Sequence, residues 1–292
     1  MKPFVKWAGG KSKLIGKIEE HLPEDFCQQE EVTYVEPFVG GGAMLFHMLK
    51  THPNITRAII NDINADLINT YIMVKENPAR LIESLRMISK EYLSQTDPAV
   101  RENIYYRMRN DYNRMNPDDG LRVPYFIFLN QTCFNGLYRV NTSGLFNVPH
   151  GKYKNPRIWT DENLFQLSEL LQNVEITSGD FADVFERISG RYVFVYFDPP
   201  YRPLETGTAA FTQYNKQKFD DKSQERLKRL CDQMTERGWR IMVSNSDSKK
   251  KGQPYFDVLY ENYHIHRFSA NRTINVYSAP DLSAKEILIT NY

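Results

Sequence analysis

The segment Asp198-Pro199-Pro200-Tyr201 combines groups that could hold and orient an amine. It directly follows the uncharged run of β-branched and aromatic residues 192–197, which is typical of a strand buried on both faces. Two prolines end the hydrogen-bonding ladder and keep the backbone extended, so the Asp198 carboxylate and the Pro199 carbonyl become a fixed pair of acceptors. Such a pair suits the two hydrogens of an exocyclic NH2, and Tyr201 offers a face on which the ring bearing that amine could stack. The alternative is a proline-stiffened turn that binds nothing.

A second segment with ligand-binding features, Lys6-Trp7-Ala8-Gly9-Gly10-Lys11-Ser12, lies near the N-terminus. Its Gly-Lys-Ser end resembles a phosphate-binding loop, but that motif requires a glycine where Val5 stands and a strand before it. We therefore expect the two glycines to let backbone approach a ligand closely, with Trp7 as a wall and Lys11 as a cation for a carboxylate. The alternative is an N-terminal loop that carries a core tryptophan.

Residues 33–49 read as a strand, a glycine turn and a helix. The dinucleotide-binding fingerprint would need a further glycine at Leu45, so a pyrophosphate ligand is not indicated. A second apolar strand ends at Asp62, twenty residues after Gly42, which is about the spacing at which a carboxylate meets ribose hydroxyls. Asp62 could also cap the helix that begins near Ala65, and the two roles are compatible.

The segment from Gly120 to Trp159 differs in charge from the rest of the chain. It contains five Lys and Arg residues and no Asp or Glu, which gives +5 over forty residues in a chain whose total is +1. Two short β-prone runs flank Thr142-Ser143-Gly144 and predict a hairpin. A basic hairpin rich in aromatic and amide side chains is typical of a surface that meets phosphates and base edges. The alternative is a solvated surface ribbon.

Positioning these segments requires an α/β frame. Apolar strands are expected at 174–177 and 239–245 and near the C-terminus at 263–268 and 285–291, whereas helical periodicity dominates from Leu67 to Trp159. Gly179-Asp180-Phe181 closes the first of these strands, with core packing as the alternative role for Asp180 and Phe181. In an open sheet of this kind, ligands sit at the carboxyl ends of the strands.

Composition bounds the class of protein. The chain has 41% hydrophobic and 25% charged residues, which is ordinary for a globular protein. Three scattered cysteines without a Cys-x-x-Cys motif argue against a disulfide framework or a zinc site, and no metal is expected. The N-terminus has no apolar signal region, and no stretch approaches membrane-spanning length, so we expect a soluble, cytoplasmic protein.

Four motifs follow one another along the chain: Lys-Trp-x-Gly-Gly-Lys, Glu-Pro-Phe-x-Gly-Gly-Gly, Asn-Asp-x-Asn and Asp-Pro-Pro-Tyr. Their order resembles that of the Dam-type DNA adenine N6-methyltransferases, and the resemblance covers nearly the whole chain. It implies an enzyme that methylates N6 of adenine in double-stranded DNA with S-adenosyl-L-methionine as cofactor. It also implies a doubly wound, Rossmann-like α/β methyltransferase domain formed by residues 1–66 and 160–292, with a mostly helical, hairpin-bearing recognition domain inserted at 67–159.

The resemblance assigns roles residue by residue. It implies that the catalytic residues are Asp198, Pro199, Pro200 and Tyr201. It implies that the cofactor is bound by Trp7, Gly9, Gly10, Lys11, Glu36, Pro37, Phe38, Gly40, Gly42, Asp62, Asp180, Phe181 and Asp198. It implies that DNA is bound by Phe134, Asn135, Leu137, Arg139, Asn141, Pro149, Lys152 and Lys154.

The hairpin looks like the recognition hairpin of the GATC-specific members of this family. By that likeness, Arg139 reads guanine with the bidentate geometry of arginine, and Leu137 and Pro149 contact thymine. Phe134 enters the base stack, and Asn135 steadies the opened site. The likeness also places the polar loop 202–219 near the target base and Asn271-Arg272-Thr273 near DNA.

Several alternatives remain open on the sequence. The enzyme could read a different sequence or act on N4 of cytosine, and a protein-glutamine methyltransferase would share the Pro-Pro-Tyr turn but not need the acid-free hairpin. Methylation of a cytosine ring carbon would require a cysteine nucleophile, for which the three cysteines offer no candidate. From another class, the protein could be a non-catalytic regulator that binds DNA and cofactor. A cognate restriction endonuclease, acting separately, is compatible with the resemblance.

Overall fold

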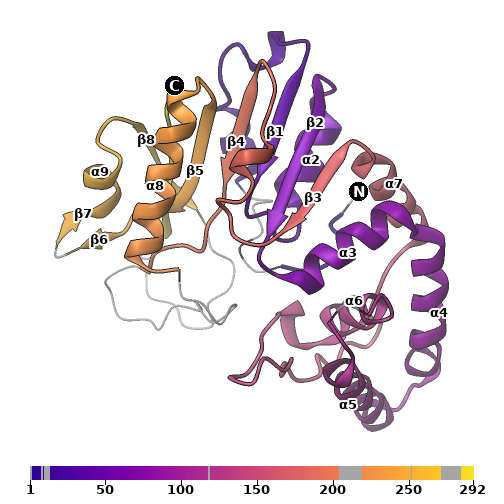
Figure 1. The fold of residues 1–292 in the computed structure, drawn as a ribbon. Helices are drawn as coiled ribbons and strands as arrows, with labels where there is room; N and C mark the ends of the chain where they lie inside the picture. Colours follow the sequence, from indigo (N-terminus) through magenta and orange to yellow (C-terminus); the bar gives the residue numbers. More distant parts are fainter. Residues whose placement is uncertain are drawn as a thin grey trace.

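A seven-stranded sheet organises the structure, which is a computed structural model that describes residues 2–7, 9, 14–117, 119–203, 219–250, 252–270 and 284–292 (Figure 1). The strand order is β3-β2-β1-β4-β5-β9-β8. The strands are β1 (Val32–Glu36), β2 (Ile55–Asp62), β3 (Val174–Ser178), β4 (Val193–Phe197), β5 (Arg240–Ser246), β8 (His264–Ala270) and β9 (Ala284–Thr290). Strands β1 to β5 are parallel, and β9 runs antiparallel to both β5 and β8. The sheet is therefore mixed and mostly parallel, and the predicted Rossmann-like α/β fold is confirmed.

The strand order reverses between β1 and β4. From β1 the chain proceeds outward through β2 and β3, and it then returns to form β4 and β5 on the other side of β1. Every residue of β1 and β4 is buried, as expected of central parallel strands. In doubly wound sheets the crevice at such a reversal, outside the carboxyl ends of the strands, is where ligands bind.

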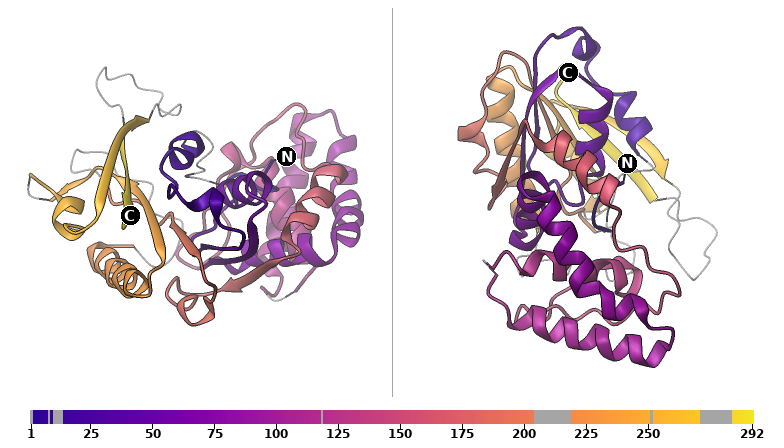
Figure 2. Two further views of the ribbon diagram at one scale, coloured as in Figure 1. Left: turned by 90° about the horizontal axis from the view of Figure 1, so that it is seen from above. Right: turned by 90° about the vertical axis from the view of Figure 1, so that its right-hand side faces the viewer.

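Helices cover both faces of the sheet, because alternate strand residues feed two separate hydrophobic clusters. Tyr34 and Phe194 point into one cluster, which also contains the apolar faces of the helices α2, α3 and α7. Val35 and Val195 point into the other cluster, which contains the buried stripe of α8. These helices are α2 (Ala43–Thr51), α3 (Ala65–Glu76), α7 (Asp161–Leu171) and α8 (Asp221–Glu236). Helices on both sides of the sheet are visible from above (Figure 2, left).

After β2 the chain forms a group of helices before it returns to the sheet at β3. Helices α4 (Pro78–Ser94), α5 (Pro98–Arg114) and α6 (Arg122–Thr132) lie beyond the sheet, with α3 between them and the strands (Figures 1 and 2). One hydrophobic cluster runs without a break from the sheet through α3 into these helices. The division into domains at residues 67 and 159 therefore stays a prediction.

The remaining elements are short. They are α1 (Ile15–Glu19), α9 (Tyr255–Leu259), a two-stranded ribbon of β6 (Lys249–Lys250) and β7 (Gln253–Pro254), and the 3-10 turns Phe26–Gln28, Phe134–Gly136 and Phe185–Arg187. None of the helices in the described ranges has both the length and the apolarity needed to cross a lipid bilayer.

Candidate active site

Three carboxyl groups gather at the carboxyl ends of β1, β2 and β4. Glu36 is only 2% exposed and accepts a hydrogen bond of 2.8 Å from the Tyr34 hydroxyl. Burial raises the pKa of Glu36 well above its ordinary value, the nearby charges of Asp198 and Asp62 raise it further, and the Tyr34 bond only partly opposes them. The strand reversal thus brings three acidic groups together, and burial favours the neutral form of Glu36.

Asp62 ties the second strand to the glycine turn. Its Oδ2 accepts a hydrogen bond from the Gly40 N–H at 3.1 Å, and its Oδ1 accepts one from the Asn64 N–H at 2.9 Å. Burial raises the pKa of Asp62, and these backbone bonds counteract the rise. The cap of α3 is Asn64, whose side chain accepts the Leu67 N–H at 3.0 Å. The alternative in which Asp62 caps this helix is therefore wrong: Asn64 is the cap, and Asp62 bonds the Gly40 and Asn64 N–H groups instead.

The glycine turn after β1 leaves no room for side chains. Gly42 has a φ of +76°, and a Cβ there would lie 2.4 Å from the Tyr71 hydroxyl oxygen. A Cβ at Gly40 would lie 2.9 Å from the Trp7 ring. The Tyr71 hydroxyl donates to the Gly40 carbonyl at 2.9 Å, and the Pro37 carbonyl accepts from Asn61 at 3.2 Å. The turn is fixed from two sides, and Trp7 packs against it, while the role of Trp7 as a wall for a ligand stays a prediction.

Other predicted cofactor residues lie around this turn or outside the described part of the chain. Phe38 stacks on Phe181 with ring centroids 5.2 Å apart, and Phe219 packs against both rings. Gly9 has a φ of +81° and open space around it. Gly10 and Lys11 lie outside the described residues, as do residues 204–218 of the polar loop and Asn271-Arg272-Thr273.

Asp180 is engaged in an ion pair that the sequence did not indicate. Both of its carboxylate oxygens accept hydrogen bonds from Arg226 on α8, at 2.7 and 2.5 Å. Partial burial acts to raise the pKa of Asp180, but the bonds from Arg226 and the Ala182 N–H outweigh it and lower the pKa. The Arg226 guanidinium also lies 4.7 Å from the centre of the Phe181 ring. Asp180 thus fixes Arg226 beside the aromatic pair of Phe38 and Phe181.

The turn after β4 is held by neighbouring strands and helices. Ser244 of β5 donates a hydrogen bond of 2.9 Å to Asp198 Oδ1, and the Tyr196 hydroxyl lies 3.1 Å from the same serine oxygen. Gln224 of α8 donates to the Pro200 carbonyl at 3.3 Å. The Tyr201 hydroxyl donates to Glu286 of β9 at 3.3 Å. These contacts fix the motif from both sides.

Ser244, Gln224 and Glu286 were missed in the sequence. A signal for Ser244 existed, since β4 and β5 were both predicted as buried strands. Their register pairs Phe197 with Val243, so the next residue of each strand, Asp198 and Ser244, lie opposite one another. The sequence analysis predicted no strand order, and that signal is usable only once β4 and β5 are known to be neighbours in the sheet.

The predicted hairpin is confirmed, although it is held by isolated bridges rather than by regular strands. Val140 pairs with Phe146 and Cys133 with His150, both antiparallel. The turn is closed by bonds from the Asn141 N–H to the Leu145 carbonyl and from the Gly144 N–H to the Asn141 carbonyl, both 2.9 Å.

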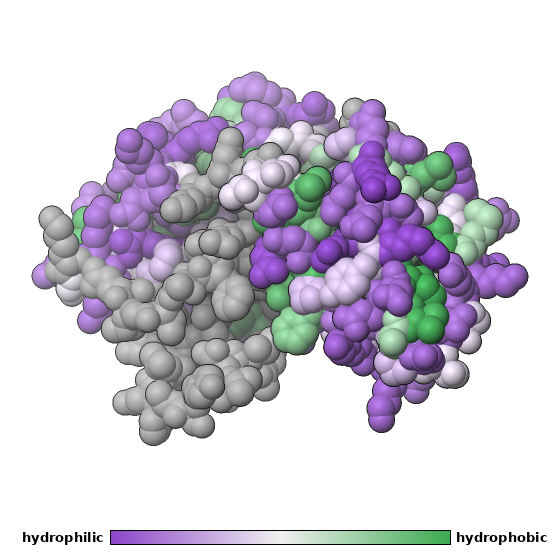
Figure 3. All heavy atoms as spheres, turned by 90° about the horizontal axis from the view of Figure 1, so that it is seen from below, coloured by the Kyte–Doolittle hydropathy of each residue, from purple (hydrophilic) through white to green (hydrophobic). Residues whose placement is uncertain are grey.

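Most of the predicted DNA-binding side chains lie on the surface of this hairpin. Phe134 is 51% exposed, and Leu137 is half-buried. The other exposed members are Asn135, Arg139, Asn141, Pro149, Lys152 and Lys154. Arg139 Nε donates to Asn147 Oδ1 at 2.8 Å, which holds the guanidinium across the hairpin. The Lys152 Nζ lies 3.6 Å from Glu102 Oε2 of α5, so the two side chains form an ion pair. Seen from below the molecule of Figure 1, the surface is mostly polar with separate apolar patches (Figure 3).

The N-terminal segment joins the hairpin to the glycine turn. Trp7 stacks on Tyr138 of the hairpin, with centroids 5.5 Å apart and planes 25° apart. Lys6, which was not among the predicted site residues, is exposed, and its Nζ lies 4.6 Å from the centre of the Tyr153 ring. A Cβ at Gly136 would lie 2.3 Å from the Lys6 side chain. The structure therefore adds Lys6 to the cations of the hairpin surface, and its place beside Trp7 in the motif was the available signal.

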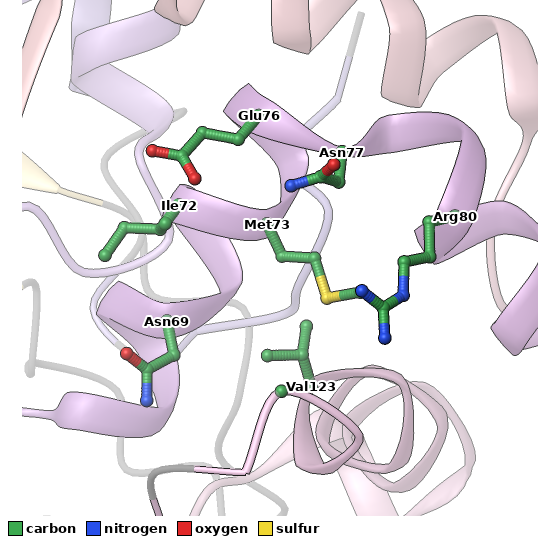
Figure 4. Close-up of a pocket in the computed structure, with 8 residues that line it drawn as sticks. Asn69, Ile72, Met73, Glu76, Asn77, Arg80 and Val123 are labelled. Carbon is green, nitrogen blue, oxygen red and sulfur yellow. The ribbon is translucent and has the colours of Figure 1, made fainter.

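A separate pocket of about 230 Å³ lies between α3, α4 and the start of α6 (Figure 4). None of the predicted site residues lines it. Among the described residues, no group of three or more His, Cys, Asp or Glu side chains could hold a metal ion. The candidate site is therefore the carboxyl ends of β1, β2 and β4, where the strand order reverses, together with the hairpin that Trp7 connects to them.

Comparison with known proteins identifies the family of the chain. The family model described as D12 class N6 adenine-specific DNA methyltransferase matches residues 7–274. The chain is 45% identical over 295 residues to a type II methyltransferase (M.MjaIII) of Methanocaldococcus jannaschii, covering 100% of this chain and 99% of that relative. It is 38% identical to a type II methyltransferase of Lactococcus lactis subsp. cremoris, covering 100% and 96%. It is 32% identical to a DNA adenine methylase of Escherichia coli, covering 98% and 93%.

Proposed function

Because the chain belongs to the D12 class N6 adenine-specific DNA methyltransferases, we propose that it methylates N6 of an adenine flipped out of a DNA duplex, with S-adenosyl-L-methionine as donor and GATC as the target. The family is adenine-specific, which removes the cytosine-N4 alternative. The observation that carries the proposal is the position of Asp198, held by Ser244 at the strand reversal close to the carboxyl groups of Glu36 and Asp62, with Pro199 directly after it.

The crevice fits the proposed cofactor. The turn at Gly40 and Gly42 excludes side chains, so backbone can approach a ligand there. Burial raises the pKa of Glu36 and of Asp62, and a positively charged ligand bound beside them would favour their charged forms. The Phe38 and Phe181 rings offer an apolar surface for a planar group. When bound, the cofactor supplies a methyl group on a positively charged sulfur.

The turn after β4 would bind and orient the target amine. A base inside a duplex cannot present its amine to this crevice, so the adenine must leave the stack. Tyr201 would stack on its ring, and Asp198 and the Pro199 carbonyl would accept both N6 hydrogens. That geometry directs the nitrogen lone pair toward the cofactor, and the Asp198 carboxylate favours the positive charge that develops on the nitrogen. Ser244 holds one oxygen of this carboxylate in place.

The hairpin would read the sequence. Residues 67–159 would form the recognition domain, in which Arg139 reads guanine and Pro149 and Leu137 contact thymine. Phe134 is exposed enough to enter the base stack, and Asn135 would steady the opened site. Asn141, Lys152 and Lys154, with Lys6 added by the structure, would position the phosphates.

Two further proposals concern the biological setting. Two of the relatives named above are type II methyltransferases, which supports a cognate restriction endonuclease that acts separately on the same sequence. A DNA substrate and three cysteines that form no disulfide support a cytoplasmic location.

The test of sequence reading is methyl transfer to short duplexes that contain GATC or one changed base pair. Replacing Arg139 by alanine should reduce discrimination at guanine by about 1–3 kcal/mol, or roughly 5- to 150-fold in kcat/KM ratios. Arg157→Ala, which removes an exposed cation of the same segment without an assigned base contact, is the matched control. If Arg139→Ala methylates only the wild-type site at the wild-type rate, the assignment of Arg139 is wrong.

A further inference from the structure

Helix α5 carries a ladder of hydrogen-bond donors along one face. The ladder consists of Arg101, Tyr105, Arg109 and Asn113, spaced four residues apart, so that all four lie on the same side of the helix. None of them was among the predicted site residues. Each donates a hydrogen bond to the backbone of segment 146–154, which contains the second arm of the hairpin and the residues directly after it.

The ladder holds this segment at three points. Asn113 contacts both backbone groups of Phe146, accepting from its N–H at 2.9 Å and donating to its carbonyl at 3.0 Å. The Val148 carbonyl accepts from the Tyr105 hydroxyl at 2.8 Å and from Arg109 at 3.3 Å. Arg101 donates to the Lys154 carbonyl at 2.7 Å.

The ladder itself is rigidly placed. Tyr105 is fully buried, and the Arg101 and Arg109 guanidinium groups lie 5.5 Å and 4.7 Å from the ring centres of Tyr92 and Tyr106. The Tyr92 hydroxyl in turn lies 2.7 Å from His150 Nε2, directly after Pro149. Because every ladder bond goes to a backbone atom, the helix fixes where the segment runs and leaves its outward side chains free to face a ligand.

Each holding point lies next to a residue assigned to DNA. Phe146 precedes Asn147, whose side chain and carbonyl hold Arg139. Val148 precedes Pro149, and Lys154 is itself one of the assigned cations. A shift of Phe146 would therefore act first on Asn147 and Arg139, whereas a shift of Val148 would act first on Pro149. Different donors of α5 hold the two points, since Asn113 holds Phe146 and Tyr105 and Arg109 hold Val148.

We propose that α5 is a specificity-determining helix, whose ladder sets the position of the reading side chains against DNA without contacting a base. The proposal rests on the proposed function, since it assumes that Arg139 and Pro149 read base pairs. Tyr105 and Arg109 are positioning residues for Pro149, and Asn113 is the positioning residue for Arg139.

The experiment compares specificity profiles. Methyl transfer by the full chain is measured as kcat/KM on the preferred duplex and on every duplex with one changed base pair, for Tyr105→Phe and Asn113→Leu beside Pro149→Ala and Arg139→Ala. Tyr105→Phe keeps the buried ring and removes only the hydroxyl. Tyr105→Phe should reduce discrimination at the same base pair as Pro149→Ala, and Asn113→Leu should reduce discrimination at the same base pair as Arg139→Ala. Each reduction should be about 2- to 10-fold, as expected for the loss of one or two neutral hydrogen bonds.

The matched control is Tyr106→Phe, which removes a hydroxyl from the adjacent residue of α5 and keeps the ring against which Arg109 packs. It should leave the profile unchanged. If Tyr105→Phe and Asn113→Leu lower kcat/KM by the same factor on every duplex, in step with a lower melting temperature, the ladder only stabilises the fold and the inference is overturned. If the wild-type chain methylates no duplex, the proposed function fails, and the inference fails with it.

Discussion

Removal of the Ser244 hydroxyl should slow methyl transfer without weakening DNA binding. Ser244 is buried, its Oγ donates to Asp198 Oδ1 at 2.9 Å, and the Tyr196 hydroxyl lies 3.1 Å from it. In Ser244→Ala the Asp198 carboxylate loses the bond that orients it toward the target amine. The hairpin that would bind DNA is unaffected, because its described contacts do not include this serine.

The size of the effect follows from the bond that is lost. A hydrogen bond to a charged group contributes roughly 1.5–3 kcal/mol. If the whole contribution acts on the barrier, the rate of the chemical step should fall roughly 10- to 150-fold, at 1.4 kcal/mol per factor of ten. Leaving the buried Tyr196 hydroxyl without this partner should cost about 1–3 kcal/mol of folding stability, which is less than the roughly 5–15 kcal/mol that holds a typical protein folded.

The assay is single-turnover transfer of labelled methyl at saturating protein and cofactor, with DNA affinity measured in parallel. Ser248→Ala is a matched control, because Ser248 is also buried and its hydroxyl has no hydrogen-bond partner among the described residues. We expect a reduced single-turnover rate for Ser244→Ala, a rate close to wild type for Ser248→Ala, and the same DNA affinity for the wild-type chain and both variants. A Ser244→Ala variant within twofold of the wild-type rate would show that this bond does not position Asp198.

Two further predictions concern the cofactor crevice. Gly42→Ala should weaken cofactor binding and destabilise the fold by more than the roughly 1–2 kcal/mol of left-handed strain, because its Cβ would lie 2.4 Å from the Tyr71 hydroxyl. Gly238→Ala is the control, because Gly238 has a φ of +78° with open space around it and this variant carries the backbone strain alone. Equal melting temperatures for the two variants would refute the steric argument. Burial and the neighbouring acids raise the pKa of Glu36, so the folded protein keeps a proton that the unfolded chain releases near pH 4.5. Stability should therefore fall as pH rises from there through the raised pKa, and a Glu36→Gln variant with an unchanged pH profile of the melting temperature would contradict this.

Local sequence predicted the elements that carry their own signal. The strand and turn at residues 192–201 were found because six apolar residues followed by two prolines permit few other structures. The glycine turn was found for a similar reason, since Gly42 adopts a φ that other residues resist. The hairpin was found by its turn residues and by its lack of acids.

Contacts between segments far apart in the sequence were not predictable in the same way. Asp62 and Asn64 are both good helix caps on local grounds; in the structure Asn64 caps α3, while Asp62 accepts a bond from Gly40, 22 residues earlier. Asp180 was assigned to the cofactor site without its partner Arg226, 46 residues later. The α5 ladder depends on the packing of a helix against a segment 33 to 53 residues away, and periodicity does not reveal such pairings.

The central claim is adenine methylation at one sequence by the Asp198 site. It is tested most directly by base-resolution mapping of modified positions on unmethylated plasmid DNA, treated with S-adenosyl-L-methionine and either the wild-type chain or Asp198→Ala. The account predicts N6-methyladenine confined to GATC with the wild-type chain and none with the variant. Methyladenine confined to another sequence would contradict the assigned recognition, and equal methylation by Asp198→Ala or no modified base in either sample would contradict the proposed chemistry.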